Sequence, residues 1–235
     1  MTDVDERVGF LEVLNQRRCV RSYDDRSVPR DVLERITNAA VVRAPSAGFS
    51  QGLRLVVVTD PATRGEIAVA AAEDELAAQG RPRWKAAAPV HVVVLTSEAD
   101  YHQRYQQPDK LEITGGTEIE WPAPYWYVDA GAAVMTLMLA AIDEGLATAI
   151  FGVTDIPALK RALGIPDDVH FVAVVTMGYP AGDDEPSKGA SVFTRRRKPR
   201  AEIVRWDRWI EDEAGPTDGL HPGVPTVSSL PPGRR

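Results

Sequence analysis

Two kinds of hydrophobic spacing alternate along this chain of 235 residues. Apolar side chains at intervals of three and four residues predict helices over 5–17 and 31–40. An Ala- and Glu-rich composition predicts a helix over 62–79, the long apolar stretch predicts one over 127–145, and Pro157 and Gly164 bound a short helix over 156–163. Continuous runs rich in Val and Leu predict strands over 53–59, 89–96, 146–153 and 169–178. The run at 89–96 shows no polar alternation, so we expect this strand to be buried on both faces. Helices and strands interleave, which indicates an α/β or α+β fold.

The regular spacing is lost in two stretches. Residues 97–124 carry no clear periodicity, and loops of that length inside a domain are usually functional or mobile. The last residues are rich in Pro and Gly and lack apolar periodicity, which is typical of a flexible or partner-wrapping tail. We therefore predict one folded domain over 1–212 and a C-terminal tail over 213–235.

The longest apolar stretch, Tyr125 to Ile142, raises the question of a membrane span. It contains Asp129 and several small residues, and it ends at Asp143, whereas a span needs about 18 to 20 clean apolar residues. We predict a buried helix and no membrane association. The first residues are acidic and lack the apolar core of a secretory signal, so we expect a cytoplasmic protein.

Composition limits the partners and the chemistry. A net charge of -7 and a pI near 5.2 argue against general nucleic-acid affinity, which requires a broad basic face. Cys19 is the only cysteine, which excludes an internal disulfide and a cysteine-based metal cluster. The four histidines show no metal-ligand spacing, and we predict no metal site.

Basic residues nevertheless gather in two short segments, Arg17–Arg21 and Arg195–Lys198. Guanidinium groups match phosphate oxygens bidentately, so such clusters favour a compact phosphorylated ligand, although a solvated helix end and a polar tail would look the same. A third segment, Ala44–Gln51, offers hydroxyls, an amide and free backbone N–H groups before a strand, which suit a polyhydroxylated ligand with a heteroaromatic ring. Neither the dinucleotide-binding glycine motif nor the P-loop motif occurs.

Four patterns, in order along the chain, resemble the flavin-dependent nitroreductases. They are Arg17-Arg18-Cys19-Val20-Arg21-Ser22-Tyr23 with Val28-Pro29; Ala44-Pro45-Ser46-Ala47-Gly48-Phe49-Ser50-Gln51 with Val56-Val57-Val58-Thr59-Asp60-Pro61; Asp129 through Gly145-Leu146-Ala147; and Gly178-Tyr179-Pro180, Pro186 and Arg196-Arg197-Lys198-Pro199. The resemblance implies an α+β fold with a central mixed, mostly antiparallel sheet flanked by helices. It also implies an interlocked homodimer that shares two FMN sites, with 1–212 as the FMN-binding domain.

The resemblance further implies a role for particular positions. Arg17, Arg18, Cys19 and Arg21 would line the phosphate, ribityl and pyrimidine side, and Arg195 and Arg197 would complete the phosphate site. Pro45, Ser46 and Ala47, from the other subunit, would lie along the isoalloxazine, with Gln51 in the same cofactor-binding loop. Ile150, Phe151 and Gly152 would bring backbone N–H groups near flavin N5. The flavin carries the chemistry in this family, so no catalytic acid or base is named.

The implied activity is FMN-dependent oxidoreduction in two half-reactions, in which NAD(P)H is replaced in one site by a nitroaromatic or quinone acceptor. Departures from the family pattern at Cys19, Phe49, Gly52-Leu53 and Met135-Thr136 leave two alternatives. One is a specialised flavin enzyme such as an enone or ring reductase, a dehalogenase or a flavin-modifying enzyme. The other is a non-catalytic flavin-binding module.

The aromatic run at 121–127 would either pack on the central helix or form a wall over the flavin, and Trp206 and Trp209 would anchor the C-terminal segment on a partner subunit.

Overall fold

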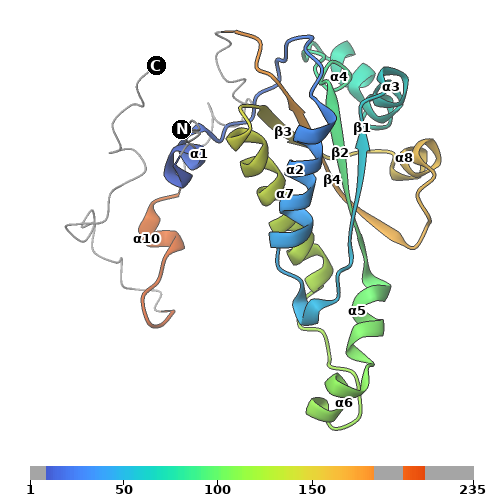
Figure 1. Ribbon diagram of the computed structural model, residues 1–235, viewed down its shortest axis with the longest axis vertical. Helices are drawn as coiled ribbons and strands as arrows, with labels where there is room; N and C mark the ends of the chain where they lie inside the picture. The colour runs from blue at the N-terminus through green and yellow to red at the C-terminus, as the bar shows by residue number, and fades with distance from the viewer. Residues whose placement is uncertain (1–8, 183–197, 210–235) are drawn as a thin grey trace, which may run out of the picture.

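A computed structural model describes residues 9–182 and 198–209 of the chain (Figure 1). In chain order the elements are α1 (Phe10–Gln16), α2 (Arg30–Arg43), the short 3-10 helix η1 (Ala47–Phe49), β1 (Leu53–Val58), α3 (Pro61–Ala70), α4 (Glu73–Ala78), β2 (Val90–Ser97), α5 (Glu98–Tyr105), α6 (Pro108–Thr114), α7 (Tyr125–Asp143), β3 (Ala147–Phe151), α8 (Ile156–Leu163), β4 (Val169–Gly178) and α10 (Arg200–Ile203).

The described strands form one sheet in the order β1-β2-β4-β3, and all three pairings are antiparallel. Of the two central strands, β2 is paired with β4 along its whole length, with one register shift at Val94/Leu95. Every residue of β2 is buried, which confirms the expectation of a strand covered on both faces. The predicted α+β fold with a mostly antiparallel sheet flanked by helices is confirmed.

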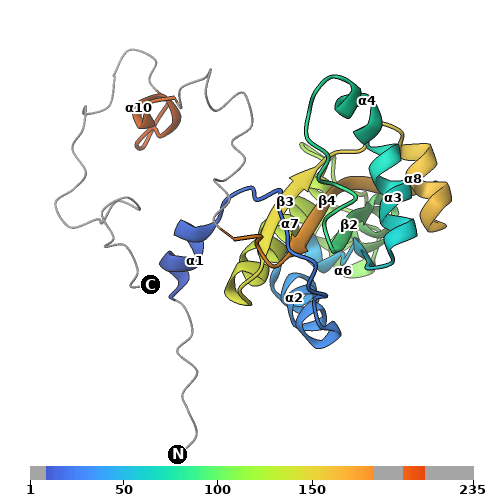
Figure 2. The same cartoon turned by 90° about the horizontal axis from the view of Figure 1, so that it is seen from above.

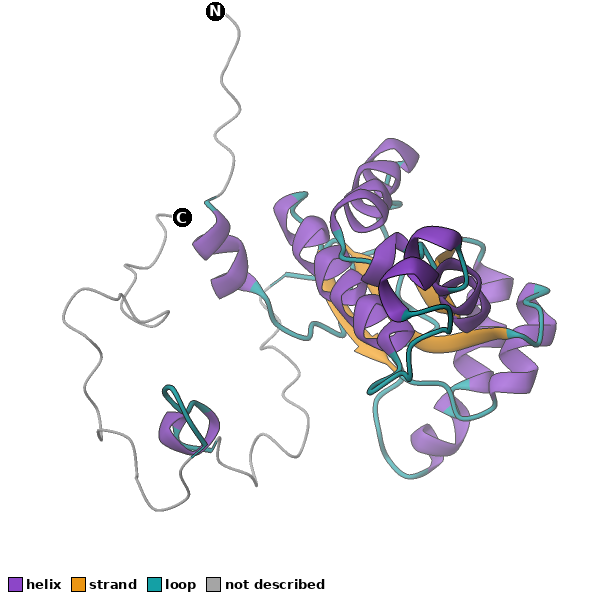
Figure 3. Ribbon diagram, turned by 90° about the horizontal axis from the view of Figure 1, so that it is seen from below, coloured by secondary structure: helices purple, strands orange, loops and turns teal. Residues whose placement is uncertain are grey.

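Helices cover both faces of the sheet, so the domain has three layers. Figure 2 shows α2 and α7 on one side of the strands and α3 and α8 on the other, and Figure 3 shows the strands enclosed between them. Alternate side chains of β2 point to opposite faces of the sheet and pack into the two hydrophobic cores. Val92 and Val94 pack with Ile36 of α2 and Leu137 of α7, whereas Val93 packs with the α3 and α8 side chains.

Helix α7 is the helix that the apolar stretch predicts. By length and composition alone it could cross a membrane, but half of its most apolar window is buried inside the protein. Ala133, Leu137 and Ala141 are completely buried, against α2 and the sheet. A stripe that includes Val128 and Met135 stays exposed at 55% and 45%.

Two sequence-based expectations are wrong. Residues 97–124 are not one irregular stretch, because Ser97 caps α5 and Pro108 begins α6, which is followed by Gly115 in the left-handed region; residues 115–124 contain no helix or strand. These helices are short and mostly polar, so they carry little apolar periodicity. The single helix expected over 62–79 is also broken, since Ala72 has a φ of 55° and divides α3 from α4.

His91 is a polar residue inside the sheet. It lies in β2, is fully buried, and its Nε2 donates to the carbonyl of Lys85 at 2.8 Å. Burial is the main cause that lowers the pKa of the ring to about 4, so the imidazole is neutral at pH 7. The hydrogen bond to a carbonyl requires the proton on Nε2.

This pKa shift makes stability depend on pH. As the pH falls below about 6.5 the unfolded chain binds a proton at His91, while the folded chain does so only near pH 4. The contribution of neutral His91 to the free energy of unfolding is therefore present above pH 6.5 and is lost on acidification. The loss amounts to about 2 kcal/mol between pH 7 and pH 5. Urea unfolding of the wild type and of His91→Gln, which keeps a donor, should show the steeper loss in the wild type; parallel profiles would contradict the assignment.

Candidate functional site

The segment at 17–21 lies along the outer edge of β3. The N–H of Val20 donates to the carbonyl of Thr148 at 2.9 Å, which joins the segment to that strand. The hydroxyl of Tyr23 donates to the Val20 carbonyl at 2.8 Å and lies 2.7 Å from the Thr176 hydroxyl of β4. Burial raises the pKa of Tyr23, so the hydroxyl keeps its proton for these bonds. The sheet therefore fixes the backbone that carries the N-terminal arginines.

In the part of the chain that the structure describes, the arginines of this segment have no acidic partners. Arg17 and Arg21 are half-buried and Arg18 is exposed, and none of them makes an ion pair or hydrogen bond through its side chain within the described residues. The Nε of Arg21 is buried and has no hydrogen-bond partner in that part of the chain. A buried polar donor without an acceptor costs free energy, so the group is suited to an anionic ligand. Cys19, a free thiol, is half-buried between them.

The edge of β3 offers backbone donors at the same place. Because residues of a strand alternate, and Thr148 faces segment 17–21, Ile150 also directs its backbone away from β4. Its side chain is 38% exposed. Gly152 is exposed, and a Cβ added there would meet nothing within 4 Å. The side chain of Phe151, by contrast, is buried in the α3 and α8 core, and its backbone faces β4.

The predicted cofactor loop at 45–51 lies at the other end of α7. The N–H of Ala47 donates to Oδ2 of Asp129, in the second turn of α7, at 2.7 Å. Segment 17–21 instead contacts β3, which follows the C-terminal end of this helix. From Asp129 to Asp143 the helix rises about 20 Å. Within one chain, segment 17–21 therefore lies at the β3 edge that carries Ile150, whereas the loop at 45–51 lies at the far end of α7.

The loop is held in an unusual backbone conformation. Gly48, Phe49 and Gln51 have φ values of 62°, 59° and 57°, a region that non-glycine residues seldom adopt. A Cβ at Gly48 would lie 2.5 Å from the Tyr105 ring, so a larger residue there would force the ring to move and would strain the backbone. The N–H of Gln51 donates to the Ser46 hydroxyl at 2.7 Å. Strain of this kind persists where surrounding contacts enforce it and is common at ligand sites.

Helix α5 supplies those contacts, which the sequence did not indicate. Tyr101 is buried and donates from its hydroxyl to the same Asp129 oxygen at 2.7 Å, and burial and the Asp129 carboxylate raise its pKa. Arg104 donates from Nε to the Gly48 carbonyl at 2.9 Å. Trp121 packs on α5, with ring centroids 4.6 Å from Tyr105 and 6.2 Å from Tyr101. At least part of the aromatic run at 121–127 therefore packs against the protein.

The remaining predicted residues are placed as follows. Pro45 and Gln51 are exposed, while Ser46 and Ala47 are half-buried. Arg195 and Arg197 lie outside the described residues. The sequence reasoning assigned no site role to Asp129 or Tyr101; a single acid inside an apolar helix is the one local signal that could have singled out Asp129.

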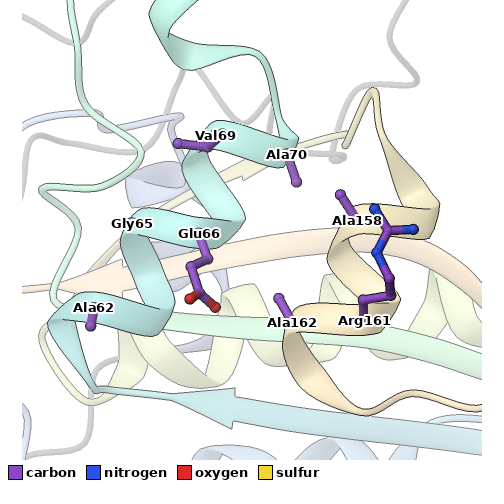
Figure 4. A pocket seen from close by; sticks show the side chains of 8 residues that line it. All are labelled: Ala62, Gly65, Glu66, Val69, Ala70, Ala158, Arg161 and Ala162. Atoms are coloured by element: carbon purple, nitrogen blue, oxygen red, sulfur yellow. The ribbon is translucent and has the colours of Figure 1, made fainter.

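A groove elsewhere on the molecule lies between α3 and α8 (Figure 4). It is lined by Ala62, Gly65, Glu66, Val69, Ala70, Ala158, Arg161 and Ala162. Glu66 points into the gap between the two helices, whereas Arg161 extends along α8. None of the predicted cofactor residues lines this groove, so the candidate site is the exposed β3 edge together with segment 17–21.

Comparison with known proteins identifies the family of this chain. Residues 14–179 match the sequence profile of the Nitroreductase family. The chain belongs to the nitroreductase family. This match covers all four strands and α7, and includes both candidate segments, 17–21 and 45–51.

Individual members of the nitroreductase family show how far the likeness extends. An FMN reductase [NAD(P)H] of Bacillus subtilis is 31% identical over 178 residues, covering 73% of this chain and 66% of that protein. A 5,6-dimethylbenzimidazole synthase of Rhodobacter capsulatus is 29% identical over 192 residues, covering 76% and 87%. The crystal structure of a nitroreductase family protein of Clostridium difficile superposes with a TM-score of 0.63 at 21% identity, covering 86% of this chain and 100% of that chain, which shows the same fold. These relatives indicate an oxidoreductase.

The two hydrogen bonds that Asp129 accepts predict that its carboxylate holds the conformation of the loop at 45–51. Asp129→Asn removes the charge that accepts two hydrogen bonds, so the loop should loosen and the free energy of unfolding should fall by about 1–3 kcal/mol. Amide hydrogen exchange at Ala47 should become faster. Asp143→Asn, at the exposed end of the same helix, is the matched control and should change stability by less than about 0.5 kcal/mol. Equal exchange at Ala47 in the wild type and Asp129→Asn would show that this carboxylate does not hold the loop.

Proposed function

We propose that this protein is an FMN-dependent oxidoreductase that uses NAD(P)H to reduce an electron-poor acceptor of the nitroaromatic or quinone type, with reductant and acceptor using one site in turn. One observation carries the proposal: the Nε of Arg21, which is buried and has no hydrogen-bond partner among the described residues, lies in a segment that is hydrogen-bonded to β3 at Thr148, two residues before the outward-facing backbone of Ile150. A phosphate acceptor and a heteroaromatic edge would satisfy both groups. The name of the Bacillus subtilis relative, FMN reductase [NAD(P)H], supports the choice of cofactor and reductant.

The residues of this chain would hold the cofactor from two directions. Arg17, Arg18 and Arg21, with Arg195 and Arg197, would bind the phosphate, and Cys19 would lie along the ribityl and pyrimidine side. The N–H groups at Ile150 and Gly152 would face the ring near N5, where donors stabilise negative charge. FMN, when bound, supplies the redox chemistry, and the protein orients it and sets its electrostatic environment.

A homodimer would complete the site, because the Pro45–Ala47 loop and the arginines lie at opposite ends of α7 in one chain. Apolar side chains that need cover support this proposal. Exposed examples are Phe10 at 67%, Val41 at 64%, Phe49 at 72%, Met135 at 45%, Trp206 at 64% and Trp209 at 72%. In the proposed dimer the loop of one chain, with Gln51, lies along the flavin that the arginines of the other chain bind.

A specialised reaction of the same fold is the second candidate. It is favoured by the likeness to a relative named 5,6-dimethylbenzimidazole synthase and by Phe49, which is 72% exposed on the cofactor loop. Turnover of nitrofuran, quinone and enone acceptors with NADH and NADPH separates the two candidates. A non-catalytic flavin module is the third candidate, and it predicts that bound flavin is not bleached by either reductant under argon.

If Arg21 and Arg197 bind the FMN phosphate, their removal should weaken the binding of FMN. The purified protein should be yellow and should bleach with NAD(P)H under argon. Arg21→Ala combined with Arg197→Ala should weaken FMN binding by at least about a hundredfold, since charge-assisted hydrogen bonds contribute about 1.5–3 kcal/mol each. Arg30→Ala with Arg161→Ala, two exposed arginines, is the matched control and should bind FMN as the wild type does. Unchanged FMN affinity in the first pair would show that these arginines are only solvated charges.

The shared site predicts complementation between two defective chains. Arg21→Ala removes the phosphate contact, and Gly48→Ala disrupts the loop because the added Cβ would meet Tyr105. In a mixed dimer purified through two different tags, one site receives both intact parts and should bind FMN with wild-type affinity. Each parent homodimer should bind weakly. Weak binding in the mixed dimer as well would mean that the loop and the arginines act within one chain.

A further inference from the structure

The turn at 84–86 concentrates buried polar contacts that the proposed function does not use. Glu73, the first residue of α4, is 4% exposed. Its Oε1 accepts hydrogen bonds from the N–H groups of Trp84 at 2.8 Å and Lys85 at 2.5 Å, and its Oε2 accepts from Ala86 at 3.2 Å. A buried carboxylate that accepts three backbone donors is well compensated, and it fixes the backbone that it binds.

Other side chains hold the same turn from different elements. Arg64 of α3 donates to the Ala86 carbonyl at 2.9 Å, and His91 of β2 donates to the Lys85 carbonyl at 2.8 Å. The ammonium group of Lys85 donates to the Ala71 carbonyl at 2.5 Å. The turn is therefore tied to α3, α4 and β2, far more firmly than an ordinary connection between a helix and a strand requires.

This turn presents the ring of Trp84 to the candidate cofactor site. The guanidinium carbon of Arg21 lies 5.2 Å from the centre of the Trp84 ring. Phe151 of β3 meets the same ring edge-on, with centroids 5.6 Å apart and planes at 90°. Trp84 thus contacts one residue of the phosphate segment and one residue of the β3 segment, which are far apart in the sequence.

The ring contact is the main restraint on the Arg21 side chain. Its Nε has no hydrogen-bond partner among the described residues, and no described carboxylate pairs with it. A guanidinium over an aromatic face is stabilised by electrostatic attraction to the ring, and a long side chain that is already oriented loses less entropy on binding. An arginine held this way is preorganised to bind an anion.

We propose that Trp84 is a positioning residue for the FMN site, which orients Arg21 and supports Phe151, and that Glu73 sets the Trp84 ring by fixing its turn. The inference rests on the proposed function, because it takes FMN as the ligand of Arg21. Trp84 acts through Arg21 in this scheme, so its effect on FMN binding depends on the arginine.

A double-mutant cycle tests this dependence. FMN is titrated into the apoprotein of the wild type, Trp84→Leu, Arg21→Ala and the double variant, and Kd is measured by flavin fluorescence. Trp84→Leu should raise Kd about threefold to thirtyfold in the wild-type background and leave it nearly unchanged in the Arg21→Ala background. Trp84→Phe, which keeps an aromatic face, should restore most of the affinity. Glu73→Gln should raise Kd in the same direction.

Tyr179→Leu is the matched control, since it removes another ring under an arginine, Arg26, at 4.0 Å. It should lower the thermal midpoint without changing the Kd for FMN. The proposal is overturned if Trp84→Leu also lowers only the midpoint, or if it raises Kd equally in both backgrounds. A wild-type protein that binds no FMN would refute the proposed function itself, whereas normal wild-type binding with an unchanged Kd in Trp84→Leu refutes this inference alone.

Discussion

The complete burial of β2 is the constraint on which the rest of the structure depends. A strand with apolar side chains on both faces must be covered on both, which places α2 and α7 on one side and α3 and α8 on the other. Little of either face is then left for a ligand. Polar chemistry is restricted to the edges of the sheet and to the ends of the helices, and β3 is one of the two edge strands.

The β3 edge becomes a candidate site because three distant segments meet there. Segment 17–21 binds it through the Val20 N–H, the turn at 84–86 approaches it through Trp84 and Phe151, and the strand contributes its own outward backbone at Ile150. The buried Glu73 carboxylate and the buried His91 ring bind backbone groups of the turn at 84–86. They hold the backbone behind the site in place and do not pair with the arginines of segment 17–21.

Sequence patterns predicted the parts of this molecule whose stability comes from continuous burial. The four strands and α7 each carry an apolar run or stripe that a local window detects. The short helices α5 and α6 depend on caps and on tertiary contacts, and these produce no apolar periodicity in the sequence. Glu73 and Trp84 could not be found from the sequence, since their significance lies in contacts made across the fold: Glu73 looks like any acid of an Ala-rich helix until its three backbone donors are known. Charge and residue chemistry singled out the arginines and the loop as ligand-binding candidates, and only the resemblance to a family assigned them to one flavin.

The separation of the loop from the arginines has an energetic consequence. Asp129 and Tyr101 hold Ala47 at one end of α7, and their contacts maintain a loop in which Gly48, Phe49 and Gln51 have positive φ. The contacts that enforce this strain are made within one chain, so they preorganise the loop for a ligand. If two chains each supply one half of a site, a cofactor that contacts both halves binds the dimer and not the separate chains. Mass action then makes FMN stabilise the association, and dimer dissociation and cofactor loss become one coupled equilibrium.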